Sequence, residues 1–313
     1  MLSYKIIVNP VSGRGRGVAS VPIINKYLEE HAIQFDLVQS ERPWHAALLA
    51  QQAAFEGFDV VVAAGGDGTA NEVINGLMAA KSSGKLSTHC PAMGILCVGR
   101  GNDLAYGVGI PADLRAGCQT LAKDYRRRVD VGHVVGGDYP HGRYFGNGVG
   151  IGFDAVVGFV ALKMKRLSGF PSYIVAALKT IFLYYQAPLV RIEFDGQTVE
   201  LSSLMISIMN GRRMGGGFMM APLALPDDGL FDLSMAAKVS RLRIFSLIPH
   251  FLRGTQATQS EIRTARACSV NVQAIQGSLP VHADGETICT HGDRLSVEII
   301  SGQIDMVCQP VKQ

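Results

Sequence analysis

Along the first third of the chain, short apolar runs alternate with longer amphipathic stretches. Four runs have the length and β-branched content of buried strands, at residues 4–8, 35–38, 59–64 and 93–98. Helical stretches follow the first two runs, one near residues 20–31 and one after Pro43. Strands that alternate with helices are typical of a mostly parallel sheet covered on both faces. The pattern predicts an α/β domain at this end of the chain.

The pattern changes near Val129, after which short runs alternate charged and apolar residues. Residues 191–195 read Arg-Ile-Glu-Phe-Asp, and the Asp195-Gly196 dipeptide that follows is a strong hairpin signal. Further strand-like runs lie at residues 204–209, 230–235, 269–274 and 295–300. Such alternation is typical of antiparallel sheets with one solvated face. We therefore expect a second domain made mainly of antiparallel β-structure.

Two segments of this second part resemble helices, at residues 155–166 and 173–185. Both combine long apolar faces with basic side chains, namely Lys163, Lys165, Arg166 and Lys179. This composition fits helices that face lipid or an interface, and it fits ordinary helices packed on a sheet equally well. A membrane-spanning helix is not expected, because polar residues and a proline interrupt the apolar run at Lys179, Gln186 and Pro188.

Composition describes a folded protein of two domains. The 313 residues are 48% apolar and 18% charged, and the net charge of +3 with a pI near 8.5 would help approach to ATP or to an anionic membrane. No nucleic-acid-binding pattern is present. The six cysteines form no C-x-x-C pair, which argues against a zinc site or a disulfide framework. The sequence begins without a signal-like segment, so we expect a cytoplasmic protein.

The Gly-Gly-Asp-Gly-Thr motif at residues 65–69 directly follows the third strand-like run. Glycines let backbone N–H groups approach an anion closely, and Thr69 is suited to cap the helix expected next. The start of that helix also favours phosphate. Asp67 would repel phosphate unless a divalent cation lay between them. The motif predicts a magnesium-nucleotide site, and the alternative is an ordinary strand-to-helix turn with a solvated aspartate.

Two other glycine-containing loops follow strand-like runs, at residues 9–13 and 99–103. Ligands of open α/β sheets bind outside the carboxyl ends of the strands. The loops after Val8, Ala64 and Val98 are therefore expected to converge on one ligand.

Four motifs, taken in order, resemble the diacylglycerol kinase catalytic family, above all its bacterial soluble lipid kinases. They are Asn9-Pro10-x-Ser12-Gly13, the turn at 65–69 with Asn71-Glu72, Gly99-Arg100-Gly101-Asn102-Asp103, and Asp284-Gly285-Glu286. The resemblance covers essentially the whole chain and includes Tyr144-Phe145-x-Asn147, Gly152-Phe153-Asp154-Ala155 and Asp228-Gly229-Leu230-Phe231-Asp232. It implies an α/β ATP-binding domain at 1–130, a β-sandwich-like lipid-substrate domain at 131–299, and an active site in the cleft between them. Residues from about 300 to 313 are expected to pack back on the first domain.

The resemblance implies a set of nucleotide-binding residues in the first domain. The set is Asn9, Ser12, Gly13, Ser40, Gly65, Gly66, Asp67, Gly68, Thr69, Asn71, Arg100 and Gly101. For Asn9 and Ser40 taken alone, a turn or cap role is the commoner one. Arg100 departs from the family, which usually has threonine at this place. Its guanidinium either contacts the phosphates of ATP or points to solvent.

Phosphoryl transfer depends on charge neutralisation and alignment, so the resemblance implies ATP and Mg²⁺ as cofactors. Asp67 is expected to be catalytic and to lie beside the metal. Asp103 and Asp130 match acidic positions that join it in a water-linked magnesium network. The alternatives are a helix cap for Asp103 and a turn at a strand end for Asp130.

Glu286 matches the general base of the family, which accepts the proton of the attacking hydroxyl. Asp284 would orient this loop. The alternative is a simple hairpin with Asp284-Gly285 as its turn and a solvated glutamate.

The segment at residues 225–230 resembles a second, structural metal site. In similar enzymes one carboxylate and two main-chain carbonyls hold Mg²⁺, here Asp228 with the carbonyls of Leu225 and Leu230. A plain Asp-Gly turn is the alternative, and calcium would also suit such ligands.

Together these features predict an ATP-dependent lipid kinase of phospholipid metabolism, which transfers the γ-phosphoryl group to a lipid hydroxyl. A diacylglycerol-like acceptor is favoured. A cytoplasmic enzyme must then meet a membrane transiently, and the apolar residues 155–185 and 218–220, with Arg212 and Arg213, are expected to dock on anionic lipid. A homodimer is suggested only by analogy. The alternatives are an NAD-kinase-like small-molecule kinase and a non-catalytic lipid-binding or regulatory protein that retains the fold.

Overall fold

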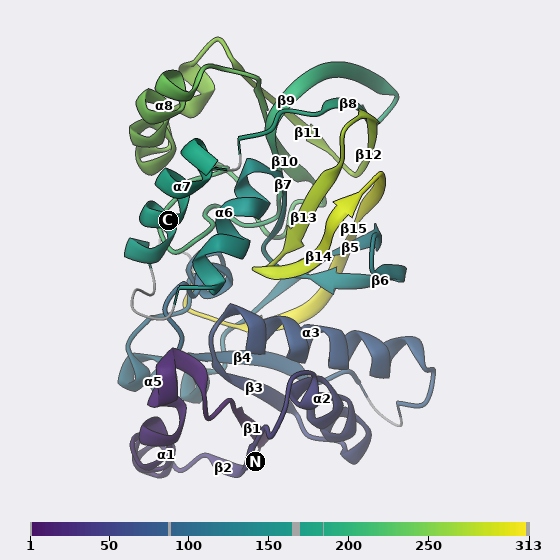
Figure 1. The fold of residues 1–313 in the computed structure, drawn as a ribbon. Coiled ribbons are helices and arrows are strands. Elements are labelled where there is room, and N and C mark those ends of the chain that lie inside the picture. The colour runs from purple at the N-terminus through teal and green to yellow at the C-terminus, as the bar shows by residue number, and fades with distance from the viewer. Residues whose placement is uncertain (1, 87–88, 165–169, 184, 311–313) are drawn as a thin grey trace. The chain divides into compact units, whose positions relative to one another are not determined.

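The computed structural model describes residues 2–86, 89–164, 170–183 and 185–310. Lys165 and Arg166, which we expected on a basic helix, lie outside these described residues. The chain divides into two compact units. The second unit is Asp130–Ser301, and the first is everything before it together with the chain from Gly302 onward. Figure 1 draws the first unit up to Val129 in purple to blue.

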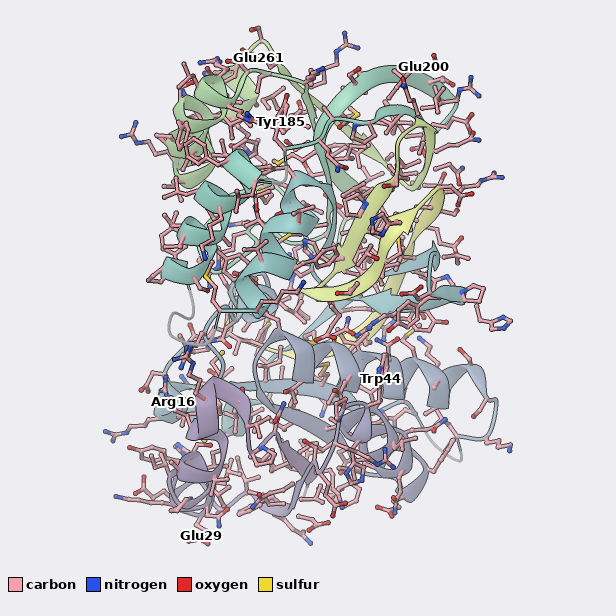
Figure 2. The ribbon with its side chains drawn as sticks, viewed as in Figure 1. Arg16, Glu29, Trp44, Tyr185, Glu200 and Glu261 are labelled. Carbon is pink, nitrogen blue, oxygen red and sulfur yellow. The ribbon has the colours of Figure 1, made fainter. Side chains whose placement is uncertain are left out.

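The first unit alternates strands and helices. In chain order its elements are β1 (Ser3–Val8), α1 (Ser12–Glu30), β2 (Gln34–Gln39), α2 (His45–Glu56), β3 (Val60–Gly65), α3 (Asp67–Ser82), β4 (Ala92–Cys97), α4 (Asp103–Val108) and α5 (Leu114–Lys123). Within α1, residues 13–15 have positive φ, so the regular helix begins only after them. Trp44, labelled in Figure 2, has a φ of 65° and immediately precedes α2.

The sheet of this unit is parallel and covered on both faces. Its order is β2, β1, β3 and β4, and the end of the last strand of the chain joins β4 through the pairing of Met306 with Met93. Alternate side chains of β1, such as Ile6 and Val8, share one core with α1 and α5. Helices α2 and α3 pack together and contact β1 and β3. Because successive side chains of a strand point to opposite faces, the two helix pairs cover opposite faces.

The second unit consists mainly of antiparallel strands. Its elements are β5 (Arg126–Gly136), β6 (Tyr139–Phe145), β7 (Gly148–Gly152), α6 (Phe153–Leu162), α7 (Phe170–Leu183), β8 (Leu189–Phe194), β9 (Gln197–Met209), β10 (Phe231–Ala237), α8 (Arg241–Arg253), η1 (Gln256–Thr258), β11 (Ile262–Ala267), β12 (Ser269–Gln276), β13 (Leu279–Ala283), β14 (Glu286–Gly292) and β15 (Arg294–Val307). Strands β5 and β15 each contain a boundary between the units.

These strands form two layers around one core. One layer has the order β14, β13, β7, β9, β10, β11, and the other has the order β9, β8, β12, β15. Strand β9 belongs to both layers because its first half pairs with β8 and its second half with β7 and β10. Large apolar side chains fill the space between the layers, including Phe145, Ile206, Phe231 and Val272. This is the β-sandwich-like architecture that the sequence predicts.

Helices α6, α7 and α8 accompany the sandwich. Helix α6 packs on α7 and on β7 and β13, and α7 contacts α8 (Figure 1). Within the described ranges, no helix combines the length and the apolar character needed to cross a membrane.

Several boundaries differ from those expected. The first helix spans Ser12–Glu30, but its residues 13–15 are not helical, so the regular helix begins near Arg16 rather than near residue 20. Helix α6 ends at Leu162. Helix α8 was not predicted, since Pro249 and its basic residues obscure the apolar face. The Ser240 hydroxyl accepts the N–H of Arg243 at its start, and Gly254 ends it in the left-handed region.

Candidate active site

Two glycine loops of the first unit meet at the carboxyl ends of β3 and β4. The carbonyl of Gly65 accepts the N–H groups of Val98 and Gly99, each at 2.9 Å. A Cβ on Gly99 would lie well inside van der Waals contact with the Cα of Gly66. Glycine is therefore required at this crossing, because any side chain would push the loops apart. The predicted convergence of these two loops is present in the fold.

Helix α3 begins at Asp67, and Gly66 is its N-cap in an extended conformation. The expectation that Thr69 caps this helix is wrong. Thr69 is the third residue of the helix, and its buried hydroxyl accepts the side-chain amide of Asn9 at 3.0 Å. The first-turn N–H groups of α3 have no partner within the helix by geometry, as an anion site requires.

The carboxylate of Asp67 joins the two loops. Its Oδ1 accepts the backbone N–H groups of Asp103 at 2.6 Å and Leu104 at 3.2 Å, which begin α4. Asn102, not Asp103, occupies the cap position of α4 and has a φ of 50°. The alternative role of Asp103 as the cap is therefore excluded, and Asp67 supplies the capping oxygen from another loop.

The carboxylates of Asp67 and Asp103 converge beside Gly101. A Cβ on Gly101 would lie 2.6 Å from Oδ2 of Asp67 and 3.5 Å from Oδ2 of Asp103. The missing side chain thus leaves a cradle between two carboxylate oxygens. Hard oxygen donors that share a small space suit Mg²⁺, whose charge would offset the repulsion between them. Among the described residues no cluster of three or more His, Cys, Asp or Glu side chains gathers to hold a metal ion, so the chain offers such a cation these two carboxylates.

Other predicted nucleotide residues surround the same loops. The carbonyl of Asn9 accepts the N–H of Ser12 at 3.1 Å, and Ser40 donates its N–H to Val8 at the edge of the sheet. Arg100 is exposed, and its guanidinium donates to the carbonyl of Gly13 at 3.3 Å. This contact ties the first glycine loop to the second.

Asn71 lies apart from the other predicted nucleotide residues. It is fully buried, and its side-chain and main-chain oxygens accept the amide of Asn75. A side chain without exposed surface offers nothing to a nucleotide in this conformation. The neighbouring Glu72 accepts the N–H of Ala46 at 3.0 Å and so caps α2 from α3.

In the second unit, Asp284 and Gly285 form the two-residue turn between β13 and β14. Their φ values are 49° and 83°, as a hairpin turn of the primed type requires. The Asp284 carboxylate is buried and accepts three N–H groups, those of Gly146, Asn147 and Gly148, at 2.8 to 3.0 Å. Glu286 follows as the first residue of β14 and is exposed. The turn before Glu286 is therefore held rigidly, while Glu286 itself is exposed to solvent.

Asp130 lies inside β5, so the alternative of a turn at a strand end is wrong. Its side chain is 2% exposed, and its Oδ2 accepts the N–H of Gly229 at 2.7 Å. Its main-chain N–H donates to Pro226. Asp130 thus holds the loop at residues 225–230 within its own unit.

The predicted structural metal site does not fit a divalent cation as the loop stands. Arg266 pairs with the Asp228 carboxylate, and its Nε lies 3.7 Å from Asp232. The second oxygen of Asp228 accepts the N–H of Leu230 at 3.1 Å. Burial raises the pKa of Asp232, the guanidinium lowers it, and the Asp228 charge raises it further. A guanidinium therefore already supplies the positive charge that the carboxylates need.

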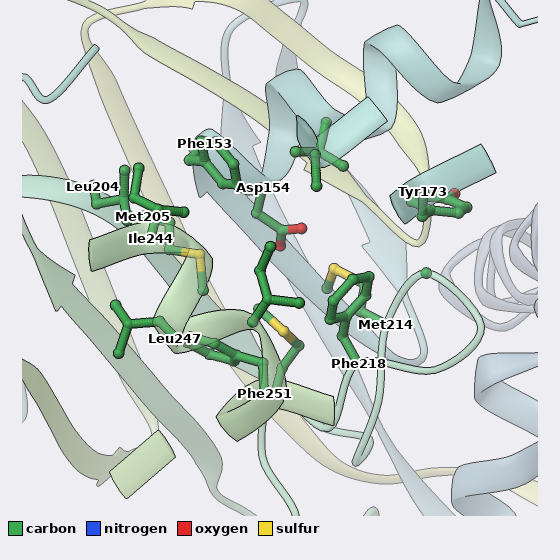
Figure 3. A pocket seen from close by; sticks show the side chains of 15 residues that line it. Phe153, Asp154, Tyr173, Leu204, Met205, Met214, Phe218, Ile244, Leu247 and Phe251 are labelled. Carbon is green, nitrogen blue, oxygen red and sulfur yellow. The ribbon is translucent and has the colours of Figure 1, made fainter. Parts of the chain in front are cut away.

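An apolar cavity of about 60 Å³ lies between α6, α7, α8 and β9 (Figure 3). Its walls include Phe153, Leu204, Phe251 and the methionines Met205, Met214 and Met220. Asp154 adds a carboxylate to this otherwise apolar lining (Figure 3). Sequence periodicity did not reveal the cavity, because its walls come from segments up to 98 residues apart, from Phe153 to Phe251.

Sequence reasoning also missed two asparagines beneath the turn. Asn147 donates to the carbonyl of Arg213 at 3.0 Å, while Asn210 donates to the carbonyls of Asp130 and Gly146. Buried amides of this kind fix the backbone to which Asp284 is anchored. The only sequence signal was the position of Asn147 inside one of the matched motifs.

Two family models match the chain. The model described as the diacylglycerol kinase catalytic domain matches residues 3–134. The model described as the YegS C-terminal NAD kinase beta sandwich-like domain matches residues 147–308. The two matches together cover both units of the fold.

Similar proteins cover most of the chain. A diacylglycerol kinase of Bacillus subtilis is 29% identical over 91% of this chain and 90% of its own length. A probable lipid kinase YegS-like protein of Chromohalobacter salexigens is 32% identical over 78% and 74%. A crystal structure of a diacylglycerol kinase from Bacillus anthracis has the same fold, with a TM-score of 0.73 at 20% identity over 99% of this chain and 97% of that one. The chain therefore belongs to the diacylglycerol kinase catalytic-domain family and is a lipid kinase, a phosphotransferase.

Proposed function

We propose that this lipid kinase uses ATP and Mg²⁺ to phosphorylate the hydroxyl of a diacylglycerol-like lipid. One observation carries the proposal: the two carboxylates beside Gly101 lie where the glycine loops of the first unit cross. Names of relatives agree with it, since several are called diacylglycerol kinase. In this proposal the first unit is the ATP-binding domain and the second is the lipid-substrate domain.

The nucleotide phosphates would bind over the crossing of the loops. Backbone N–H groups at the start of α3 and the absence of side chains at Gly66 and Gly99 favour close approach of phosphate oxygens. The guanidinium of Arg100 is exposed beside the carbonyl of Gly13, where it adds positive charge to the same loops. These features bind the donor, and they neutralise part of its charge.

Asp67 and Asp103 would hold the cation within the first unit. Bound Mg²⁺ supplies neutralisation of the negative charge on the transferring phosphoryl group. The chain's own contribution is orientation. Asp67 is fixed by two backbone N–H groups, so its second oxygen keeps one direction.

Glu286 would act as the general base. The lipid hydroxyl oxygen attacks the γ-phosphorus, its proton passes to the Glu286 carboxylate, and the bond from the γ-phosphorus to the β–γ bridging oxygen breaks to release ADP. The exposed carboxylate suits this role because the acceptor must reach it. The three backbone N–H groups that donate to Asp284 hold the turn in place.

The apolar cavity of the second unit would accept an acyl chain of the lipid. Its present volume of about 60 Å³ is narrow for such a chain. Methionine side chains are unbranched and repack easily, so the walls that contain Met205, Met214 and Met220 are suited to widening around the chain.

Helix α7 would meet the membrane. It exposes Phe182 and Leu183, which are 62% and 69% accessible, beside the exposed Lys179. Lys163 and Lys179 also line a cavity of about 490 Å³ with both polar and apolar walls. Apolar side chains next to lysines favour contact with anionic lipid. Phe182→Ser with Lys179→Glu should abolish sedimentation with phosphatidylglycerol vesicles, and equal binding to neutral vesicles by the natural chain would refute the anionic preference.

A substrate panel tests the proposed reaction. Radiolabelled ATP with Mg²⁺ would be offered diacylglycerol, a sphingoid base, phosphatidylglycerol and NAD, and we expect label chiefly in phosphatidic acid from diacylglycerol. Label in NAD would favour the small-molecule alternative. No label in any acceptor, from a chain that still binds vesicles, would favour a non-catalytic lipid-binding protein.

Glu286→Gln tests the base. We expect kcat to fall by about 1,000-fold while ATP affinity is unchanged, because positioned general bases contribute about 10²- to 10⁴-fold. Glu193→Gln, on the exposed face of β8, is the matched control and should leave kcat unchanged. Normal turnover of the Glu286 variant would remove this residue from the mechanism.

A further inference from the structure

The buried His282 and the partly exposed Asp154 form a pair beside the apolar cavity. The Nε2 of His282, on β13, lies 3.6 Å from the Oδ2 of Asp154, in the first turn of α6. The histidine is 4% exposed. The Oδ2 atom is buried, and within the described part of the chain it has no hydrogen bond. A buried carboxylate oxygen without a hydrogen bond is costly, so the imidazole 3.6 Å away should matter to it.

Glycine makes room for this pair. Gly150 on β7 is the cross-strand partner of His282. A Cβ on Gly150 would lie inside van der Waals contact with both the Oδ2 of Asp154 and the Nε2 of His282. Any larger residue would separate the two side chains. The His282–Asp154 pair therefore requires glycine at position 150 of β7.

The second ring nitrogen of His282 points to the turn that precedes Glu286. Its Nδ1 accepts the N–H of Gly285 at 3.3 Å. An accepting Nδ1 requires that the proton of the neutral ring lie on Nε2, where it faces Asp154. The imidazole thus connects a carboxylate of the cavity wall to the backbone of the turn, and Glu286 is the next residue along the chain.

We propose that His282 and Asp154 are positioning residues for Glu286. This proposal rests on the proposed role of Glu286 as the base. Asp154 fixes the tautomer and the orientation of the imidazole, and the imidazole holds the second residue of the Asp284-Gly285 turn. An acyl chain in the cavity would displace water from Asp154. Removal of water strengthens its attraction to His282, so a long-chain acceptor tightens the turn that carries the base.

Kinetics on the full chain test this proposal. His282→Phe keeps the ring but loses both nitrogens, and Asp154→Asn weakens the orienting group. Each should lower kcat by about tenfold to 100-fold with the KM for ATP unchanged, since a displacement of about 1 Å costs up to about 100-fold. His282→Asn, whose side-chain oxygen can still accept the Gly285 N–H, should recover part of the loss. His141→Phe, on the exposed strand β6, is the matched control.

Double variants separate positioning from a general loss of structure. His282→Phe should slow Glu286→Gln no further, because a residue that acts only through Glu286 has no effect once the base is gone. The loss in His282→Phe should also be larger with long-chain than with short-chain diacylglycerol. Multiplicative losses, or a loss independent of chain length, would overturn the proposal.

A spectroscopic arm does not depend on kinase activity. In the full chain labelled with ¹⁵N-histidine, the His282 signal, assigned by its loss in His282→Phe, should show the Nε2–H tautomer and should shift in Asp154→Asn. The Nδ1–H tautomer would overturn the pair even if the kinase is active. Failure of every lipid to accept phosphate would instead refute the proposed function and leave this result to decide the pair.

Discussion

An Asp-Gly dipeptide forms part of the candidate site residues in each unit, and its local structure differs between the two. Asp67-Gly68 begins a helix after a buried parallel strand, whereas Asp284-Gly285 is the tight turn of an antiparallel hairpin. Both carboxylates accept backbone N–H groups from a distant segment. Asp67 does so with one oxygen and is half-buried, while Asp284 uses both oxygens and is buried.

The difference indicates where the chemistry lies. In the first unit the anchoring residue also directs an oxygen toward the cradle beside Gly101, so one side chain joins structure and ligand binding. In the second unit Asp284 is fully engaged by the backbone, and the reactive role passes to the exposed Glu286. The Asp-Gly motif alone therefore does not show whether its aspartate is structural or binds a ligand. The number of backbone N–H partners and the exposure of the carboxylate distinguish the two roles.

Asp67→Asn should give the largest effect on this comparison. The amide oxygen can still accept the N–H groups at the start of α4, but the charge that would hold the cation is lost. We expect the catalytic rate to fall by at least about 100-fold, with little change in stability. Initial rates over a Mg²⁺ series, with thermal unfolding as the control, measure this. An unchanged rate would show that Asp67 is only a cap.

Asp284→Asn should act chiefly on stability. An amide places an NH₂ group against at least one of the N–H donors at residues 146–148, so a charge-assisted hydrogen bond is lost and a buried donor is left unmatched. We expect the free energy of unfolding to fall by about 2 to 3 kcal/mol in urea titrations. A stability equal to that of the natural chain would contradict the anchoring role.

Gly99→Ala tests the crossing of the loops. Its Cβ would collide with the backbone of Gly66, so the loops must separate, and we expect ATP affinity to fall by about tenfold for a cost near 1.4 kcal/mol. Trp44 fluorescence or calorimetry would follow the titration. Gly84→Ala is the control for backbone strain away from the loops, because Gly84 has a φ of 65° and nothing lies within 4 Å of the added Cβ; it should bind ATP normally. Equal affinities in the two variants would mean that the crossing does not shape the nucleotide site.

The smallest effect concerns acid stability of the first unit. The Ser3 N–H and hydroxyl, with His89 and Arg126 nearby, lower the pKa of Asp59 from its ordinary value of 3.8 despite partial burial. A lowered folded-state pKa adds stability above the unfolded value, and that stability is lost as the pH falls through the folded value. Asp59→Asn should therefore be less stable at pH 7, and the difference should shrink as the pH falls through the lowered pKa of Asp59. A difference that persisted in acid would rule out this origin. Asp138→Asn, in the β5–β6 turn, is the control.

Much of the first unit was predictable from the sequence. Continuous apolar runs such as 59–64 mark buried parallel strands, and glycines after them mark the loops at the carboxyl ends. The hairpin at Asp195-Gly196 was equally clear, and the structure confirms it. Local sequence alone decides such features.

The remaining features depend on contacts between distant segments. Strand β7 is too rich in glycine to show a strand pattern, and it matters through the pairing of Gly150 with His282, which is 132 positions later in the chain. The cap of α4 by Asp67 and the contact of Arg100 with Gly13 likewise join separate loops. Strand register and the crossing of loops are set by tertiary packing, so no local sequence pattern predicts them.

The last strand has a consequence for how the protein is made. Strand β15 ends in the first unit, where Met306 pairs beside β4 and Val307 enters the core. A truncated chain that stops at Val129 would therefore leave β4 with an unpaired edge and invite aggregation. Because synthesis proceeds toward the carboxyl end, the ribosome supplies this strand only after the whole second unit has emerged. The nascent first unit must wait with an incomplete sheet until the final residues arrive.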